Sequence, residues 1–154
     1  RYEVCGIAEY SYPAGYYDLV VSNLALHYLA DLDDIYRKVF STLRPGGVFL
    51  FNIEHPVFTA GAREDWARDT EGRPVCWPVD NYYYPGERTT LFLGQEVKKQ
   101  HHTLTQILMG LIRCGFVLEA VEEAMPDPSM LDLPGMADEM RRPMMLLVKA
   151  RKPV

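Results

Sequence analysis

The chain has 154 residues, a common size for one domain, and 48% apolar with 24% charged residues exclude an intrinsically disordered protein. Its 16 basic and 21 acidic residues give a net charge of −5, which argues against nucleic acid as a partner. The chain contains no apolar stretch near the roughly 20 residues that span a bilayer, so we expect no membrane partner.

The amino-terminal half is predicted to contain a β-prone run at residues 1–5 and then a strand at residues 17–23. The second stretch is continuously apolar at its centre, which is typical of a parallel strand buried on both faces. Apolar residues then recur at helical spacing from Leu32 to Leu43, which predicts a helix, and Asp31 is placed to cap its amino terminus.

Pro45-Gly46-Gly47 is expected to stop this helix, and residues 48–53 form a second apolar strand. The order strand, helix, strand predicts a βαβ unit with two parallel strands. From His55 to about Gly94 the periodic pattern breaks, over a distance far longer than a usual α/β loop. We interpret residues 56–94 as a long loop insertion, and its many aromatic residues predict an ordered lid.

The carboxyl-terminal part is predicted to hold one more helix and up to three strands. Residues 88–100 are strand in part, and Thr103 with Gln106 fits a capping box that opens a helix ending at Gly115. Residues 116–121 and 144–150 are the remaining predicted strands. We interpret residues 1–154 as a single domain.

Two strand ends carry the polar side chains of a candidate pocket. Residues 22–28 follow the first buried strand and residues 52–56 follow the second, and each stretch contains an Asn and a His. The carboxyl ends of parallel strands meet at one edge of a sheet, where open α/β sheets bind their ligands. Together with the long aromatic segment beside them, these strand ends predict a pocket at this edge.

The same residues resemble the class I S-adenosylmethionine-dependent methyltransferases. Residues 17–23 and the turn 43–47 resemble that family's fourth strand and the turn into its fifth strand. Residues 53–56, 77–80, 99–103 and 142–144 resemble a bacterial subgroup that acts on small molecules. The resemblance implies a Rossmann-like α/β fold, with a mostly parallel sheet, an antiparallel last strand and truncation at the amino end.

The resemblance also implies S-adenosylmethionine as the cofactor. The residues expected to line it are Gly6, Ile7, Ala8, Asn23, Leu24, Ala25 and His27. At positions 6–8 the family pattern carries an Asp whose side chain faces the adenine amine. Gly6 cannot accept that hydrogen bond, although Glu9 is near. The family's glycine-rich loop and its ribose-binding acid have no counterpart in these residues, so we interpret the chain as the carboxyl-terminal part of a longer domain.

Methyl transfer is an in-line displacement at a sulfonium, helped by positioning of the nucleophile and exclusion of water. A base is needed when the nucleophile must lose a proton. We expect catalytic roles for Glu54, His55 and Asp80. The expected substrate-binding residues are Tyr28, Trp77, Tyr82 and His101. Each of these side chains also has a structural reading, as a cap, a core group or part of an interface.

The predicted function is methyl transfer from S-adenosylmethionine to a small-molecule acceptor. Two alternatives stay open: a non-catalytic binding or assembly module with this fold, and a Rossmann-type enzyme that uses a dinucleotide. A truncated sheet edge predicts self-association. Three widely spaced cysteines, Cys5, Cys76 and Cys114, predict reduced thiols and a cytoplasmic location, and no residues cluster at zinc-ligand spacing, so we expect no metal site.

Overall fold

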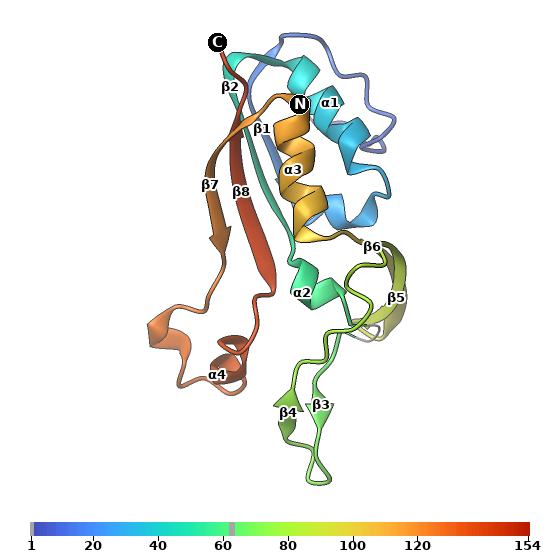
Figure 1. Cartoon of the computed structure of the whole chain (residues 1–154), viewed down its shortest axis with the longest axis vertical. Helices are drawn as coiled ribbons and strands as arrows, with labels where there is room; N and C mark the ends of the chain where they lie inside the picture. The colour runs from blue at the N-terminus through green and yellow to red at the C-terminus, as the bar shows by residue number, and fades with distance from the viewer. Residues whose placement is uncertain (1, 62–63) are drawn as a thin grey trace.

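A four-stranded mixed sheet is the centre of the computed structural model, which describes residues 2–61 and 64–154 (Figure 1). Its strand order is β1 (Tyr17–Asn23), β2 (Leu43–Glu54), β8 (Met145–Arg151) and β7 (Val117–Glu123). β1 and β2 are parallel, whereas β8 is antiparallel to both of its neighbours. The predicted α/β fold with an antiparallel last strand is therefore confirmed.

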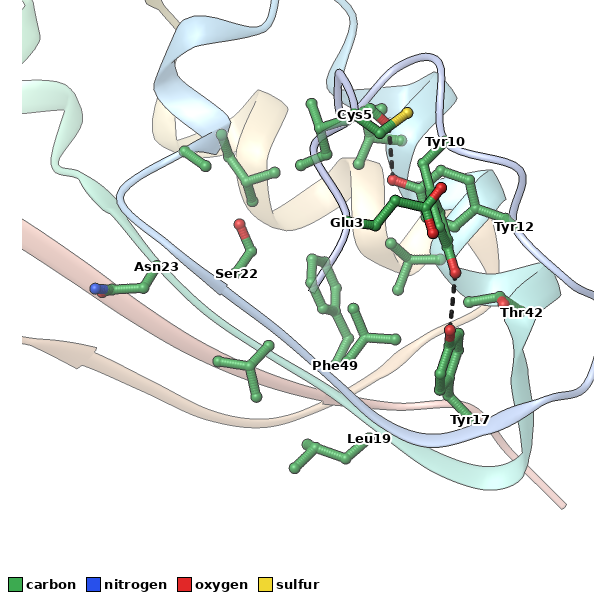
Figure 2. Close-up of a pocket in the computed structure, with 17 residues that line it drawn as sticks. Glu3, Cys5, Tyr10, Tyr12, Tyr17, Leu19, Ser22, Asn23, Thr42 and Phe49 are labelled. Atoms are coloured by element: carbon green, nitrogen blue, oxygen red, sulfur yellow. Dashed lines mark hydrogen bonds between the residues drawn. The ribbon is translucent and has the colours of Figure 1, made fainter. Parts of the chain in front are cut away.

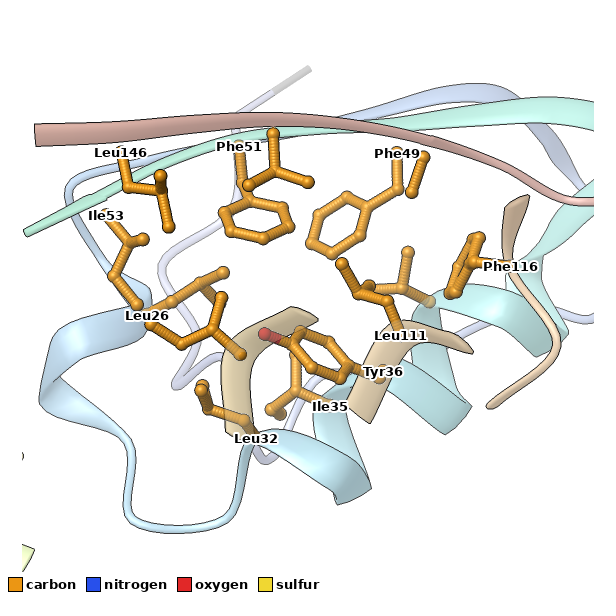
Figure 3. Packing of buried hydrophobic residues seen from close by; sticks show 14 of the residues in the cluster. Leu26, Leu32, Ile35, Tyr36, Phe49, Phe51, Ile53, Leu111, Phe116 and Leu146 are labelled. Atoms are coloured by element: carbon orange, nitrogen blue, oxygen red, sulfur yellow. The ribbon is translucent and has the colours of Figure 1, made fainter. Parts of the chain in front are cut away.

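Two helices cover one face of this sheet. α1 (Leu32–Thr42) connects β1 to β2, and the Asp31 side chain caps it by accepting a hydrogen bond from the Asp34 amide at 2.9 Å. α3 (Leu104–Cys114) opens with the predicted capping box of Thr103 and Gln106. The two helices lie side by side under the sheet (Figures 1 and 3). Both helices and the βαβ unit agree with the sequence prediction.

The hydrophobic core lies between these helices and the sheet (Figure 3). Phe49, Phe51 and Ile53 alternate along β2 and point toward the helices, where Tyr36 packs against both phenylalanine rings. Leu146 and Val148 extend the same buried layer on β8. This layer fixes the register in which the strands end, because a slip by one residue would turn each of these side chains to the other face.

The opposite face of the sheet stays exposed in the described part of the chain. Leu19 is 54% exposed and Val21 is 59% exposed, and Leu50 and Val117 lie on the same open face. The expectation that residues 17–23 are buried on both faces is thus wrong for these residues, since α1 and α3 pack on the same side. Among the described residues, β1 pairs with a strand on one side alone.

Two boundaries differ from the sequence prediction. Residues 2–5 form no strand, and Tyr2 and Val4 are fully exposed because no described strand lies beside them. α1 ends at Thr42 and β2 begins at Leu43, so Pro45-Gly46-Gly47 lies within β2 and does not end the helix. The register between β1 and β2 shifts at this point, with Tyr17 opposite Leu43 and Leu19 opposite Val48.

The segment predicted as one long loop contains several short elements. These are α2 (Pro56–Thr59), β3 (Ala67–Arg68), β4 (Pro74–Cys76) and β5 (Gly86–Phe92). β5 forms a hairpin with β6 (Gln95–His101), so residues 88–100 belong to two strands. The remaining elements are η1 (Leu26–Tyr28), η2 (Pro128–Met130) and α4 (Met136–Glu139). Within the described ranges, none of the helices is long and apolar enough to cross a membrane.

Gly47 provides a test of the packing between β1 and β2. A Cβ at this position would lie 2.9 Å from the Arg44 carbonyl oxygen and 3.3 Å from that of Asp18. We expect Gly47→Ala to lower the free energy of unfolding by about 1–3 kcal/mol, as measured by urea denaturation. Arg44→Ala is the control, because it removes an exposed ion pair with Asp18 and should cost less than about 1 kcal/mol. Equal losses would contradict this packing.

The open sheet face and the unpaired side of β1 lead us to expect self-association. Exposed strand edges and apolar patches favour contact between chains. Analytical ultracentrifugation should show concentration-dependent oligomers, and the double variant Leu19→Lys/Val21→Lys should be monomeric at the same concentrations. A wild-type chain that remains monomeric over the whole concentration range would refute this expectation.

Candidate functional site

Three strands end at the same edge of the sheet, because β1, β2 and β7 share one direction. β1 ends at Asn23 opposite Asn52, with their side-chain amides 3.2 Å apart, and β2 continues for two more residues to Glu54. The Leu24 amide donates to the Asn52 carbonyl oxygen at 2.9 Å, and Leu24 itself has a positive φ of 53°. The chain therefore turns sharply out of the sheet where the sequence predicts a ligand.

A pocket of about 470 Å³ lies beside β1, between α1 and the amino-terminal segment (Figure 2). It wraps around the unpaired edge of the strand, because Leu19 and Val21 from one face and Val20 and Ser22 from the other all line it. Of the seven residues expected to line a cofactor, Ile7, Asn23 and Ala25 line this pocket. Those that do not are Gly6, Ala8, Leu24 and His27.

The hydroxyl groups that line this pocket differ in whether they are already hydrogen-bonded within the protein. The Tyr10 and Tyr17 hydroxyls are 2.8 Å apart, and this hydrogen bond raises the pKa of Tyr10 to about 12. The Tyr12 hydroxyl donates to the Ile7 carbonyl oxygen at 2.8 Å. By contrast, the buried Ser22 hydroxyl has no hydrogen-bond partner in the described chain (Figure 2). Ser22 therefore remains able to bind a ligand.

The other predicted cofactor residues take part in local contacts. Gly6 accepts backbone hydrogen bonds from Glu9 and Tyr10, which folds residues 6–10 into a turn. The Ala8 carbonyl oxygen accepts from the Lys38 ammonium at 2.9 Å, so this turn is tied to α1. These contacts hold the wall of the pocket through main-chain atoms.

A buried ion cluster lies at the end of β2. Lys99 of β6 is 2% exposed, and its ammonium lies 2.6 Å from Oε1 of Glu54 and 2.9 Å from Oε2 of Glu64. Burial raises the pKa of both carboxyl groups against the opposing effect of Lys99. Burial alone would lower the pKa of Lys99, but its hydrogen bonds to the two carboxylates outweigh that effect and raise it. The cluster anchors the β5–β6 hairpin to the sheet.

Sequence analysis included Lys99 in the stretch 99–103 that carries the resemblance but gave it no role, and it did not identify Glu64. A period of two along β6 turns Val97, Lys99 and His101 to the inner side of the hairpin. This alternation could have predicted that Lys99 faces inward, whereas nothing in the sequence around Glu64 indicates that it reaches the cluster.

His27 is buried beside the same cluster. Its Nδ1 accepts a weak hydrogen bond from the Glu54 amide at 3.4 Å, and its Nε2 lies 3.9 Å from Oε1 of Glu54. Burial, assisted by the charge of Lys99, lowers the pKa of His27 to about 4. The imidazole is therefore neutral at pH 7. Oε2 of Glu54 is buried and has no hydrogen-bond partner within the described residues.

His55 caps α2 and faces the end of β7. Its Nδ1 accepts from the Val57 amide at 3.0 Å, and its Nε2 lies 2.8 Å from Oε1 of Glu123. Burial lowers the pKa of His55, although Glu123 acts in the opposite direction. The main-chain hydrogen bond to Nδ1 places the proton of the neutral ring on Nε2, toward Glu123.

Two of the predicted substrate-binding residues have their polar groups engaged in internal hydrogen bonds. His101 is fully buried, with Nδ1 2.7 Å from the Thr59 hydroxyl and Nε2 2.9 Å from the Tyr82 carbonyl oxygen. The Tyr82 hydroxyl accepts from the Leu104 amide at the start of α3. These groups join the hairpin to the first turns of two helices.

The remaining predicted residues are dispersed. The Trp77 indole donates to the Val57 carbonyl oxygen at 3.1 Å and stacks on Phe58. Asp80 is exposed and accepts from the neighbouring Asn81 amide. Tyr28 is also exposed, with its ring beside His27. The structure thus brings Glu54 and His27 together, and does not bring Asp80 or Tyr28 into the same cluster.

The low pKa of His27 predicts acid sensitivity. In the unfolded chain His27 binds a proton below about pH 6.5, whereas the folded chain resists that proton until about pH 4. Stability should therefore fall as the pH drops through this interval, by about 2 kcal/mol at pH 5 from this group.

Urea denaturation at pH 7 and pH 5 measures this loss. His27→Asn is the matched variant, because the Asn side-chain oxygen can still accept from the Glu54 amide but does not titrate. Between pH 7 and pH 5 this variant should lose about 2 kcal/mol less unfolding free energy than the wild type. An imidazole NMR titration midpoint for His27 near 6.5 would contradict the assignment.

Comparisons with known proteins agree with the fold. Residues 1–51 match a family model described as a methyltransferase domain. A crystal structure assigned as an S-adenosylmethionine-dependent methyltransferase from Listeria monocytogenes is 45% identical, with a TM-score of 0.95. The match covers 100% of this chain and 69% of that one.

Two further relatives extend the comparison. An S-adenosylmethionine-dependent methyltransferase from Mesorhizobium loti is 44% identical, with a TM-score of 0.87, over 97% of this chain and 68% of that one. An uncharacterised Haemophilus influenzae protein is 28% identical over 145 residues, which cover 91% of this chain and 56% of the relative. The chain thus spans little more than half of that curated relative. On the identity and coverage of the Listeria and Mesorhizobium structures, the chain belongs to the S-adenosylmethionine-dependent methyltransferases.

Proposed function

We propose that the pocket beside β1 binds S-adenosylmethionine and that the protein transfers its methyl group to a small-molecule acceptor. The observation that carries this proposal is the buried Ser22 hydroxyl, which lines the pocket along β1 one residue before the carboxyl end of the strand and lacks a partner among the described residues. A buried hydroxyl without a partner costs about 1–3 kcal/mol, and a ligand would recover that energy.

The lining of the pocket suits this cofactor. A volume of about 470 Å³ lies within the usual range for small-ligand sites. Ile7, Leu26 and Val20 supply apolar walls for a base and a ribose ring. Asn23 and Ala25 extend the lining to the strand end.

When bound, the cofactor supplies an electrophilic methyl group. The residues of this chain position the acceptor and accept its proton. Glu54 is the side chain best suited to accept a proton, because Oε2 has no partner in the described chain while Oε1 is held by Lys99. His55 is less suited, since its Nδ1 already accepts a main-chain hydrogen bond. The buried, neutral His27 helps to exclude water from this end of β2.

Calorimetric titration with S-adenosylhomocysteine tests the cofactor pocket. We expect micromolar binding to the wild-type chain. Ala25→Trp should weaken it at least tenfold by filling the pocket, and Ser22→Ala should weaken it about two- to tenfold through one lost hydrogen bond. Ala120→Trp is the control, because Ala120 lies exposed on β7.

The outcomes separate the proposed enzyme from a non-catalytic module. No binding, or equal binding by Ala25→Trp, would refute the assignment of the pocket. Binding without transfer of labelled methyl groups to any small amine, alcohol or phenol tested would favour the binding-module alternative. Transfer that Glu54→Gln abolishes without loss of cofactor binding would support the role of Glu54.

A further inference from the structure

The buried ion cluster at the end of β2 holds more negative charge than an anchor requires. The Lys99 ammonium is bound by carboxylates of both Glu54 and Glu64, and the three side chains are 2%, 9% and 5% exposed. One carboxylate is enough to neutralise the ammonium. A second buried carboxylate adds a desolvation cost that neutralisation does not need. Stability alone therefore does not account for Glu64.

The backbone at Glu64 is strained. Its φ of 48° lies in the left-handed region, which a residue with a Cβ adopts at a cost in energy. Such conformations cluster at functional sites, where the surrounding structure holds them. Glu64 lies between α2 and β3 and belongs to neither element. A strained backbone thus brings the second carboxylate to Lys99.

The two carboxylate oxygens of Glu54 have different surroundings. Oε1 lies 2.6 Å from the Lys99 ammonium and 3.9 Å from Nε2 of His27. Oε2 is buried and has no hydrogen-bond partner in the described chain. Lys99 therefore fixes the carboxylate through one oxygen and leaves the other oxygen available to a ligand.

The surroundings of the cluster are largely aromatic. The Lys99 ammonium lies 5.9 Å from the ring centroid of Phe58 and 5.6 Å from that of Phe92. Charges interact strongly in such a place, because little water is present to screen them. A change of one charge in the cluster should therefore have a large effect on the remaining charges.

Lys99 and Glu64 act on Glu54 in opposite directions. Lys99 lowers the pKa of Glu54 against the effect of burial, whereas repulsion between the two carboxylates favours a proton on either of them. The other titratable group that faces Glu54 in the described chain is His27 from η1, whose ring is neutral at pH 7. A proton acceptor works best when its pKa lies near the operating pH. A fully neutralised carboxylate would be too weak a base, and one without an ammonium would already carry a proton.

We propose that Lys99 and Glu64 are positioning residues for the proton acceptor Glu54, and that together they set its proton affinity. Lys99 holds Oε1 and keeps the carboxylate ionised before the reaction. Glu64 shares the same ammonium, which leaves Glu54 basic enough to accept a proton. The inference rests on the proposed function, and it assigns the methyl acceptor to neutral molecules with an N–H or O–H group. The O–H bond at Oε2 forms as that N–H or O–H bond breaks.

Carboxyl NMR titration of Glu54 in two variants tests the proposal. Lys99→Met removes the ammonium and should raise the proton affinity of Glu54 about tenfold or more. Glu64→Gln removes the second negative charge at nearly constant size and should lower the proton affinity about threefold or more. Shifts in the same direction, or no shift in Glu64→Gln, would overturn the proposal. Glu64→Gln decides the outcome by itself if Lys99→Met does not fold.

Glu87→Gln is the matched control on the same hairpin. It removes an exposed ion pair in which Glu87 lies 3.0 Å from the Lys98 ammonium. The titration of Glu54 should not change in this variant. A shift as large as that of Glu64→Gln would show that loosening of the hairpin, and not the charge of Glu64, sets the proton affinity.

The pH dependence of methyl transfer extends the test to the reaction. With an amine, alcohol or phenol that the wild type methylates, the rate should fall at low pH as Glu54 becomes protonated. This fall should move to higher pH in Lys99→Met and to lower pH in Glu64→Gln. A pH dependence that neither variant moves would overturn the role in transfer.

Calorimetric titration with S-adenosylhomocysteine separates the two possible failures. Cofactor binding by a chain in which the Glu54 titrations do not move in opposite directions refutes this inference alone. Opposite movements without cofactor binding refute the proposed function, and leave Lys99 and Glu64 as the groups that set the protonation of a buried carboxyl.

Discussion

The parallel pairing of β1 with β2 is the constraint on which the other features depend. Two parallel neighbours require a crossover, and α1 supplies it while covering one face of the sheet. The register sets Asn23, the last residue of β1, opposite Asn52, two residues before β2 ends at Glu54. The edge formed in this way holds the cofactor pocket at β1 and Glu54 at β2. A slip of one residue would bury Asn52 in place of Phe51 and remove both.

The elements that the sequence predicted well are those whose signals are local. α1 and α3 each carry their own capping residue and their own apolar stripe, and the start of each was predicted correctly, whereas α1 ends before the expected stop at Pro45. The hairpin of β5 and β6 was less clear, because its strands lack a strong apolar alternation. Residues 17–23 were predicted to be buried on both faces, because an apolar strand indicates that burial is favoured but not which residues provide it.

The candidate site shows the same limit at the level of side chains. Residue type and position at a strand end predicted that His27 and Glu54 lie at one edge of the sheet but assigned them to different roles, whereas the structure brings their side chains to 3.9 Å of each other. They gave no information on Lys99 and Glu64, which reach the cluster from distant segments. They also did not reveal that both nitrogens of His101 bind other groups of the chain. Whether a polar side chain is available to a ligand depends on tertiary partners.

The anchoring of the hairpin by Lys99 has a consequence for its response to heat. The hydration of charged groups becomes less favourable as temperature rises, so the cost of burying this ammonium and its two carboxylates falls on warming. The apolar contacts between the sheet and its helices gain no comparable advantage. The hairpin should therefore keep its hold on the end of β2 at temperatures where the packing of α1 and α3 has begun to loosen. A buried ion cluster therefore differs from apolar packing as an anchor for the β5–β6 hairpin, because its contribution relative to the apolar contacts increases on heating.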